Sequence, residues 1–128
     1  MRPKFRAWLK EENKMIEPSD ILSISFKLCE MTPNYLYGFE KEKYDFSDLK
    51  LMQTTGLCDK EGTEVFEGDI LKSNKYITSV FYERGAYCVK FRRTPNTTVT
   101  MDVVSFIEKY KTKIIGNIYE NPELLEVE

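Results

Sequence analysis

The sequence predicts a mainly β protein: a small SH3-like or related β-barrel with an added N-terminal β-sheet and one or two short helices. Short runs of alternating polar and apolar residues recur along the 128-residue chain, and this pattern is typical of half-buried strands. Turns that contain Gly, Asp or Asn separate most of these runs, as in folds made of short strands and tight hairpins. Aromatic residues make up 13% of the chain, and flat side chains pack well on a pleated sheet.

The length favours a single domain. Within it we expect N-terminal strands and a loop in residues 1–50, and the barrel-like part with a C-terminal helix in residues 51–128. The N-terminus lacks the apolar segment of a secretory signal, and no apolar run is long enough to span a membrane. A cytoplasmic protein without a membrane partner is therefore expected.

The first 50 residues predict two strands and a loop. Residues 4–9 alternate as a half-buried strand, with a short return at Met15. Residues 21–29 predict a second strand whose inward side chains are Leu22, Ile24, Phe26 and Leu28. Residues 31–50 predict an extended loop with a helical turn after Ser47. Its aromatic anchors would be Tyr35, Tyr37, Phe39, Tyr44 and Phe46.

The middle of the chain predicts two turns in close succession. Residues 51–58 and 63–66 read as a hairpin whose turn, at residues 59–62, uses Gly62 for a positive φ. Gly68 then permits a tight corner before a new strand begins at Ile70. These turns set the register of the expected barrel.

The last third predicts a second hairpin, a helix and a closing strand. Residues 76–81 and 86–91 would pair around residues 83–85, followed by a loop at 92–96 and a short strand at 97–100. Residues 102–110 fit a helix whose core face carries Val103, Phe106, Ile107 and Tyr110. We expect the strand at 114–119 to pair with the strand at Ile70, and a short helix to begin at Pro122.

The composition offers little support for catalysis. The chain contains no histidine, which excludes histidine-based acid–base chemistry and histidine metal ligands. The acidic residues of the middle segment lack the ligand spacing of a calcium loop; they are Asp59, Glu61, Glu64, Glu67 and Asp69. We therefore expect no catalytic residue, no metal site, no cofactor and no enzymatic activity.

The three cysteines, Cys29, Cys58 and Cys88, are widely spaced and form no CxxC motif. An odd number without such a motif favours free thiols in a reducing compartment. We expect them to be buried and chemically inert.

The candidate functional surface is a basic and aromatic segment. Residues 75–113 have a net charge of +5, although the whole chain has −2. The candidate nucleic-acid-binding residues are Tyr82, Arg84, Lys90, Arg92 and Arg93, because aromatic side chains stack on bases and cations meet phosphates. The other interpretation is an ordinary hairpin with a solvated basic face, which the isoelectric point of about 5.4 favours.

Three segments carry a family resemblance: MRPKFRAWLKEENKMI at the start, LMQTTGLCDKEGTEVFEGDIL in the middle and IIGNIYENPELL near the end. Together they resemble the YopX protein family, found mainly in phages and prophages of Gram-positive bacteria. The matching positions are Phe5, Arg6, Trp8, Gln53, Thr55, Gly56, Asp59, Gly62, Glu67, Gly68, Asp69, Ile70, Gly116, Asn117, Tyr119, Asn121 and Pro122. The resemblance implies a small β-rich protein of unknown function, without assigned catalytic residues, in the host cell of a phage or prophage.

Two functional hypotheses follow. The first is a protein-interaction or self-assembling module, such as a homo-oligomer, because short strands leave edges to pair and aromatic side chains favour interfaces. The alternative is a nucleic-acid-binding accessory protein that uses the basic hairpin. A third hypothesis is a metal-dependent hydrolase built on the carboxylates of the middle segment.

Overall fold

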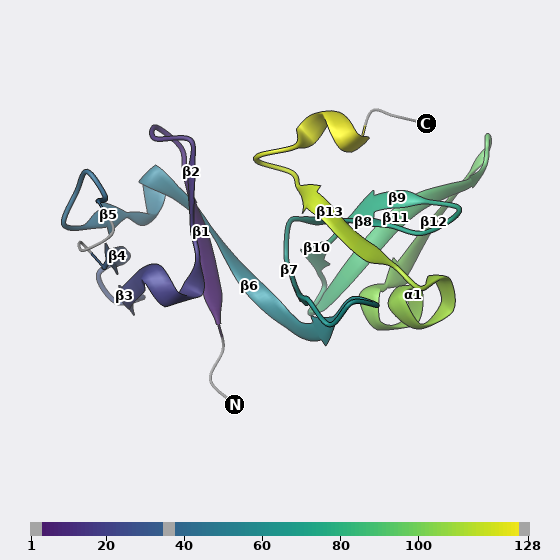
Figure 1. Cartoon of the computed structure of the whole chain (residues 1–128), viewed down its shortest axis with the longest axis horizontal. Helices are drawn as coiled ribbons and strands as arrows, with labels where there is room; N and C mark the ends of the chain where they lie inside the picture. The colour runs from purple at the N-terminus through teal and green to yellow at the C-terminus, as the bar shows by residue number, and fades with distance from the viewer. Residues whose placement is uncertain (1–3, 35–37, 126–128) are drawn as a thin grey trace. The chain divides into compact units, whose positions relative to one another are not determined.

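The structure of the protein, a computed structural model, describes residues 4–34 and 38–125. It is mainly β, as predicted, with one α-helix and short 3-10 segments in the described part (Figure 1). The chain divides into two compact units, Met1–Gln53 and Thr54–Glu128. The division falls inside strand β6 (Leu49–Cys58), a few residues after the predicted boundary between residues 50 and 51.

The N-terminal unit is built on strand β1 (Phe5–Leu9), which pairs with β2 (Lys14–Ile16) on one side and with the first half of β6 on the other. The predicted alternation holds for Ala7 and Leu9, which are fully buried, but Arg6 on the opposite face is buried as well. The strand is therefore covered on both faces.

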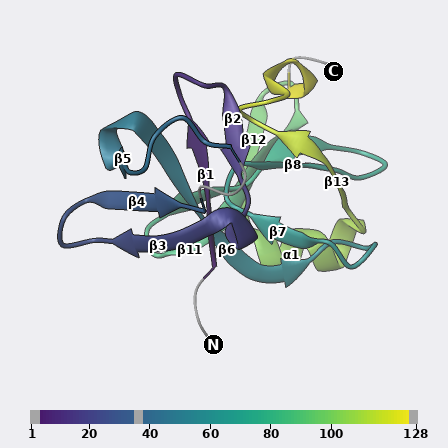
Figure 2. The ribbon, with the colours of Figure 1, turned by 60° about the vertical axis from the view of Figure 1, so that its left-hand side comes forward.

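The predicted strand at residues 21–29 is wrong beyond Ser25. The structure has η1 (Pro18–Asp20), β3 (Ile21–Ser25) and β4 (Glu30–Pro33), and a turn between the two strands (Figure 2). The expected inward side chains include three that are exposed: Leu22 at 66%, Phe26 at 59% and Leu28 at 64%. A register shift between Ile21 and Ser23 displaces the alternation. The Ser25 hydroxyl then accepts the Leu28 amide at 3.1 Å and holds the turn.

Residues 31–50 contain more regular structure than the predicted loop. They include β5 (Tyr44–Asp45) and η3 (Phe46–Asp48), the latter close to the predicted helical turn. Tyr44 is buried and donates its hydroxyl hydrogen to Glu12; burial and this carboxylate raise the pKa of Tyr44 to about 12. Phe39 and Phe46 pack against the core of this unit, whereas Tyr35 and Tyr37 lie outside the described residues.

The C-terminal unit consists of short antiparallel sheets (Figure 1). The second half of β6 pairs with β7 (Glu64–Phe66). In the second sheet, β8 (Asp69–Lys72) lies between β9 (Ile77–Ser79) and β13 (Lys113–Asn117). In the third, β11 (Ala86–Thr94) lies between β10 (Phe81–Glu83) and β12 (Thr97–Asp102). Helix α1 (Val103–Tyr110) and η4 (Pro122–Leu125) complete the unit.

The predicted closing strand is confirmed. Gly116 lies opposite Ile70 and Ile114 opposite Leu71, with a register shift between the two pairs. The helix prediction is also confirmed: Val103 and Phe106 are buried in the core, and the Asp102 carboxylate caps the helix by accepting the Ser105 amide at 2.8 Å. The expected C-terminal helix begins at Pro122 as predicted, and its described part is the 3-10 segment η4.

Asp59 connects the first turn of this unit to its last strand. One carboxylate oxygen accepts the amides of Glu61 and Thr63 at 2.9 Å each, which holds the turn, and Gly62 has the predicted positive φ of 83°. The other oxygen accepts the Ile114 amide at 2.9 Å. Asp59 is only 7% exposed, and its carboxylate satisfies three backbone donors at a part-buried junction.

Candidate nucleic-acid interface

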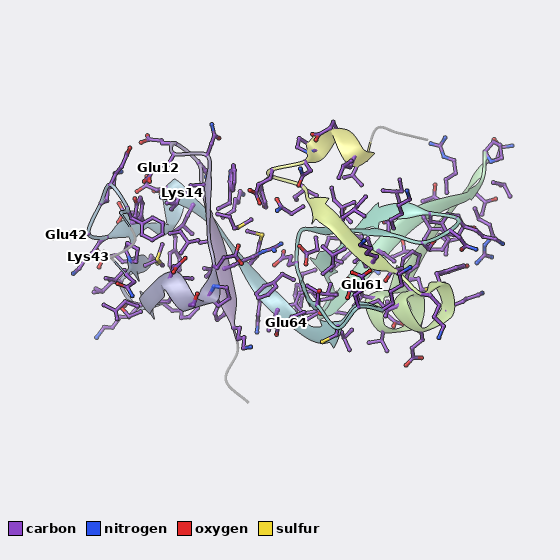
Figure 3. The ribbon with its side chains drawn as sticks, in the orientation of Figure 1. Glu12, Lys14, Glu42, Lys43, Glu61 and Glu64 are labelled. Atoms are coloured by element: carbon purple, nitrogen blue, oxygen red, sulfur yellow. The ribbon has the colours of Figure 1, made fainter. Side chains whose placement is uncertain are left out.

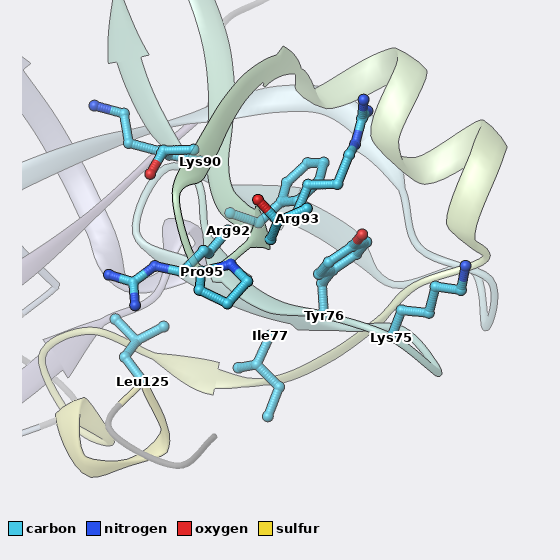
Figure 4. Close-up of a pocket in the computed structure, with 11 residues that line it drawn as sticks. Lys75, Tyr76, Ile77, Lys90, Arg92, Arg93, Pro95 and Leu125 are labelled. Carbon is cyan, nitrogen blue, oxygen red and sulfur yellow. The ribbon is translucent and has the colours of Figure 1, made fainter.

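A basic groove of about 860 Å³ lies on the C-terminal unit, at the end of β11 that is distant from the β10–β11 turn (Figure 4). This basic groove is lined by Lys75, Tyr76, Ile77, Lys90, Phe91, Arg92, Arg93, Thr94, Pro95, Thr98 and Leu125. These residues come from the β8–β9 turn, β9, the end of β11, the following turn, β12 and η4. Segments far apart in the sequence thus form one concave surface.

Strand β11 supplies three of the four cations. The sequence predicted a loop at residues 92–96, but β11 continues to Thr94 and only a tight turn at Pro95 separates it from β12. Val89 and Phe91 point into the core, so the alternating positions Lys90 and Arg92 face solvent, as predicted. The register with β12 shifts between Arg92 and Thr94. In Figure 4, Lys90 and Arg92 extend to one side of the groove, and Arg93 extends to another.

Hydrogen bonds fix the wall of the groove that carries Lys75 and Tyr76. The buried Thr78 hydroxyl donates to the Lys90 carbonyl at 2.7 Å and accepts the Lys90 amide at 3.3 Å, which joins β9 to β11. Ser73 closes the preceding turn, since its hydroxyl accepts the amides of Lys75 and Tyr76 at 3.1 and 2.9 Å. The backbone that carries Lys75 is therefore held in place relative to β11.

Aromatic and apolar side chains form the floor of the groove. The half-buried Tyr76 ring lies 4.3 Å from the Phe91 ring, centroid to centroid, and Phe91 is 5% exposed. Ile77 and Leu125 lie below Arg92 in Figure 4. A surface with cations at its rim and flat apolar groups between them suits a ligand that has both phosphates and bases.

The positive charge of the groove is local. Its lining contains four basic residues and, among the residues the structure describes, no Asp or Glu. The C-terminal unit as a whole has ten Lys and Arg against twelve Asp and Glu, a net charge of −2. Because salt screens charges beyond about 8 Å at physiological ionic strength, a ligand in the groove responds mainly to the nearby cations. The low isoelectric point therefore does not argue against anion binding here.

The structure brings together three of the five predicted site residues: Lys90, Arg92 and Arg93 line the groove. Tyr82 and Arg84 do not. They lie at the β10–β11 turn, where Tyr82 packs edge-on against Tyr87 at 5.0 Å. At about 3.3 Å per residue, the extended strand between Arg84 and Arg92 separates them by roughly 20 Å or more.

Sequence reasoning missed Lys75 and Tyr76 as parts of the site. The only available signal was that Lys75 begins the basic segment of residues 75–113. Their proximity to β11 depends on the pairing of β9 with β8 and on the Thr78 bridge, neither of which a local pattern specifies.

Four acidic residues of the middle segment form hydrogen bonds or ion pairs within the fold. Asp59 bonds three amides, the Asp69 carboxylate accepts the Phe66 amide at 2.7 Å, and Glu64 accepts the Thr54 hydroxyl at 2.7 Å. Glu61 forms a solvent-exposed ion pair with Lys113 at 3.6 Å. Figure 3 shows Glu61 and Glu64 at separate positions along the β6–β7 hairpin. Within the described ranges, no group of three or more Cys, Asp and Glu side chains is arranged to hold a metal ion.

The prediction of buried cysteines is wrong for two of the three. Cys29 and Cys58 are exposed, and Cys88 is half-buried. Cys29 belongs to the β3–β4 turn and has a positive φ of 55°, so it leaves the strand in which the sequence placed it. No helix among residues 4–34 and 38–125 is long and apolar enough to cross a membrane.

The fold and the groove define a small, mainly β protein with a basic groove that has an aromatic floor. The model of the YopX protein family matches residues 4–126, so the chain belongs to the YopX family. This match spans both units, including the segments that the three matching motifs did not cover.

A solved structure shows the same fold. The crystal structure of protein EF1440 from Enterococcus faecalis aligns with a TM-score of 0.63 and 25% sequence identity, covering 98% of this chain and 99% of that one. No curated protein matches the chain.

Proposed function

We propose that this YopX protein is a non-enzymatic binding protein whose basic groove takes single-stranded nucleic acid, in the cell of a phage or prophage host. The observation that carries the proposal is the groove itself: Lys75, Lys90, Arg92 and Arg93 line it together with the Tyr76 ring, and its described lining contains no carboxylate. The family supports the phage or prophage context.

A single strand fits this surface better than a duplex. The floor of the groove is formed by apolar groups around Tyr76, and a base can contact them only if it is unstacked and unpaired. The cations at the rim would meet the backbone phosphates. Recognition by stacking and charge tolerates any base sequence, so we expect weak sequence preference.

Fluorescence anisotropy with labelled single-stranded and duplex oligonucleotides tests the proposal. We expect the single strand to bind more tightly, with an affinity that falls as salt rises from about 50 to about 200 mM, because phosphate contacts release counterions. No binding of the single strand at the lower salt concentration would refute the proposal. Equal binding of the duplex would refute the role of unstacked bases.

A second candidate function is self-association through the N-terminal unit. Leu22, Phe26 and Leu28 expose about 60% or more of their surface in one short hairpin, and contiguous exposed apolar groups often mark interaction surfaces. We expect light scattering after gel filtration to give a mass above that of the monomer. The variant Phe26→Ser with Leu28→Ser should restore the monomer. A monomeric wild-type protein at micromolar concentration would dispose of this candidate.

A further inference from the structure

A second basic hollow, of about 460 Å³, lies beside the groove on the C-terminal unit. Four lysines line it, and the described lining contains no acidic residue. The lining residues are Lys60, Asn74, Lys75, Lys109, Tyr110 and Lys111. Neither the sequence patterns nor the family assigns a role to this hollow.

The hollow and the groove share a wall. Lys75 lines both. Tyr76 of the groove and Tyr110 of the hollow are in edge-to-face contact, with ring centroids 5.3 Å apart. The two concave surfaces therefore meet at Lys75 and this pair of tyrosines.

Backbone hydrogen bonds hold the lysines of the hollow in place. Lys111 has a left-handed φ of 52° and ends α1, with its amide bonded to the Ile107 carbonyl at 3.2 Å. The Lys60 amide bonds to the Thr112 carbonyl at 2.9 Å, which ties the β6–β7 turn to the end of the helix. The Lys109 ammonium lies 5.5 Å from the centre of the Tyr110 ring. Like the groove, the hollow thus combines several cations with a tyrosine in one lining.

Lysines at the end of a helix also have a structural role, since they offset the partial negative charge of the helix C-terminus. That role explains Lys109 and Lys111. It does not explain why Lys60 and Lys75, from two other segments, converge on the same hollow.

We propose that the groove and the hollow form one continuous track, in which a single strand runs from Arg92 past Lys75 to Lys109 and Lys111. This inference rests on the proposed function and extends it. A short oligonucleotide would fill the groove alone, whereas a longer one would place additional phosphates over the hollow. The hollow therefore adds affinity only for the longer ligand.

The test compares oligothymidylates of about 4 and about 12 nucleotides by anisotropy over a series of salt concentrations. The variant is Lys109→Gln with Lys111→Gln. For the longer oligonucleotide, the plot of the logarithm of affinity against the logarithm of salt concentration has a negative slope. The magnitude of this slope should decrease by about 1.4 in the variant, since each phosphate contact contributes about 0.7 for a single strand. The shorter oligonucleotide should bind the variant and the wild type equally.

The matched control is Lys72→Gln with Arg84→Gln. It removes two exposed positive charges of the same unit, and these residues line neither the groove nor the hollow. This control variant should leave the salt slopes for the shorter and the longer oligonucleotide within error of the wild-type values. Thermal unfolding of each variant monitors the helix-stabilising role of the lysines.

Each outcome is decisive. An unchanged slope for the longer oligonucleotide, with intact binding of the shorter one, would overturn the track and leave the proposed function standing. An equal loss for both lengths, or an equal effect in the control, would also overturn it, because the lysines would then act through general charge or stability. If the wild type binds neither oligonucleotide, the proposed function itself fails.

Discussion

Replacing Asp59 with alanine is expected to lower the free energy of unfolding by about 3 kcal/mol, because each of three part-buried amides left without its partner costs about 1 kcal/mol, the low end of the range for a buried donor. The Asp59 carboxylate accepts these amides, from Glu61, Thr63 and Ile114, at 2.9 Å each. The first two define the β6–β7 turn, and the third holds the start of the closing strand. Chemical denaturation followed by circular dichroism measures the change.

The asparagine variant, Asp59→Asn, separates the two functions of the carboxylate. The substituted side chain would keep one acceptor oxygen for the turn, but its amide nitrogen cannot accept the Ile114 amide. We expect this variant to cost about 1–3 kcal/mol, less than Asp59→Ala. The matched control is Glu61→Gln, which removes a carboxylate in the same turn whose ion pair with Lys113 is exposed. Its effect should stay below about 1 kcal/mol; a control as damaging as Asp59→Ala would contradict the special role of Asp59.

The same carboxylate makes stability depend on pH. Burial raises the pKa of Asp59, but the amides of Ile114, Thr63 and Glu61, together with the Lys113 charge, outweigh it and hold the pKa below its ordinary value. The ionised Asp59 carboxylate therefore contributes its full stabilisation above the pKa of an aspartate in the unfolded chain, about 3.9. This stabilisation is lost as pH falls through the lower pKa that Asp59 has in the folded protein. The stability difference between the wild type and Asp59→Asn should shrink in acid. A difference that stays constant down to low pH would contradict this account.

Loss of the groove arginines is expected to have the largest effect on binding. Arg92→Ala with Arg93→Ala should lower the affinity for single-stranded DNA by about 10- to 100-fold at low salt. It should also decrease the magnitude of the salt slope by about 1.4, as for two lost phosphate contacts. Both side chains are exposed, and among the described residues no carboxylate forms an ion pair with either. Their removal should therefore change the free energy of unfolding by no more than about 0.5 kcal/mol.

Arg84→Gln is the control for this pair. It removes a positive charge from the turn at the other end of β11, outside the groove. Binding by this variant should equal that of the wild type. If Arg84→Gln weakens binding as much as the loss of Arg92 and Arg93, the ligand contacts the tip of the hairpin, and the groove is not the site.

Local patterns predicted the elements that depend on interactions between residues close together in the sequence. The turn at Gly62, the helix capped by Asp102 and the alternation of Lys90 and Arg92 all depend on short-range chemistry that the sequence displays. The pairing of the strands at Ile70 and Ile114 was also predictable, since both are apolar and flanked by turn residues. The prediction failed at residues 22–29, where a register shift between Ile21 and Ser23 displaces the alternation and residues 26–29 form a turn, so that Leu22, Phe26 and Leu28 face solvent.

The candidate site was predicted only in part for a related reason. Lys90, Arg92 and Arg93 are close in sequence, so their common surface was visible as a basic segment. Lys75 and Tyr76 reach the same surface only through the Thr78 bridge and the turn at Ser73. Such long-range contacts depend on how the sheets pack, which periodicity does not encode.

A nuclear magnetic resonance titration of the ¹⁵N-labelled protein with a single-stranded oligothymidylate tests the central claim most directly. Binding in the groove predicts that the largest amide shift changes occur at residues 75–77 and 90–94, and extend to residues 109–111 with a longer oligonucleotide. The amides of residues 83–85 should change little. Shift changes confined to other parts of the chain, or none at low salt, would contradict the assignment of the groove as a nucleic-acid interface.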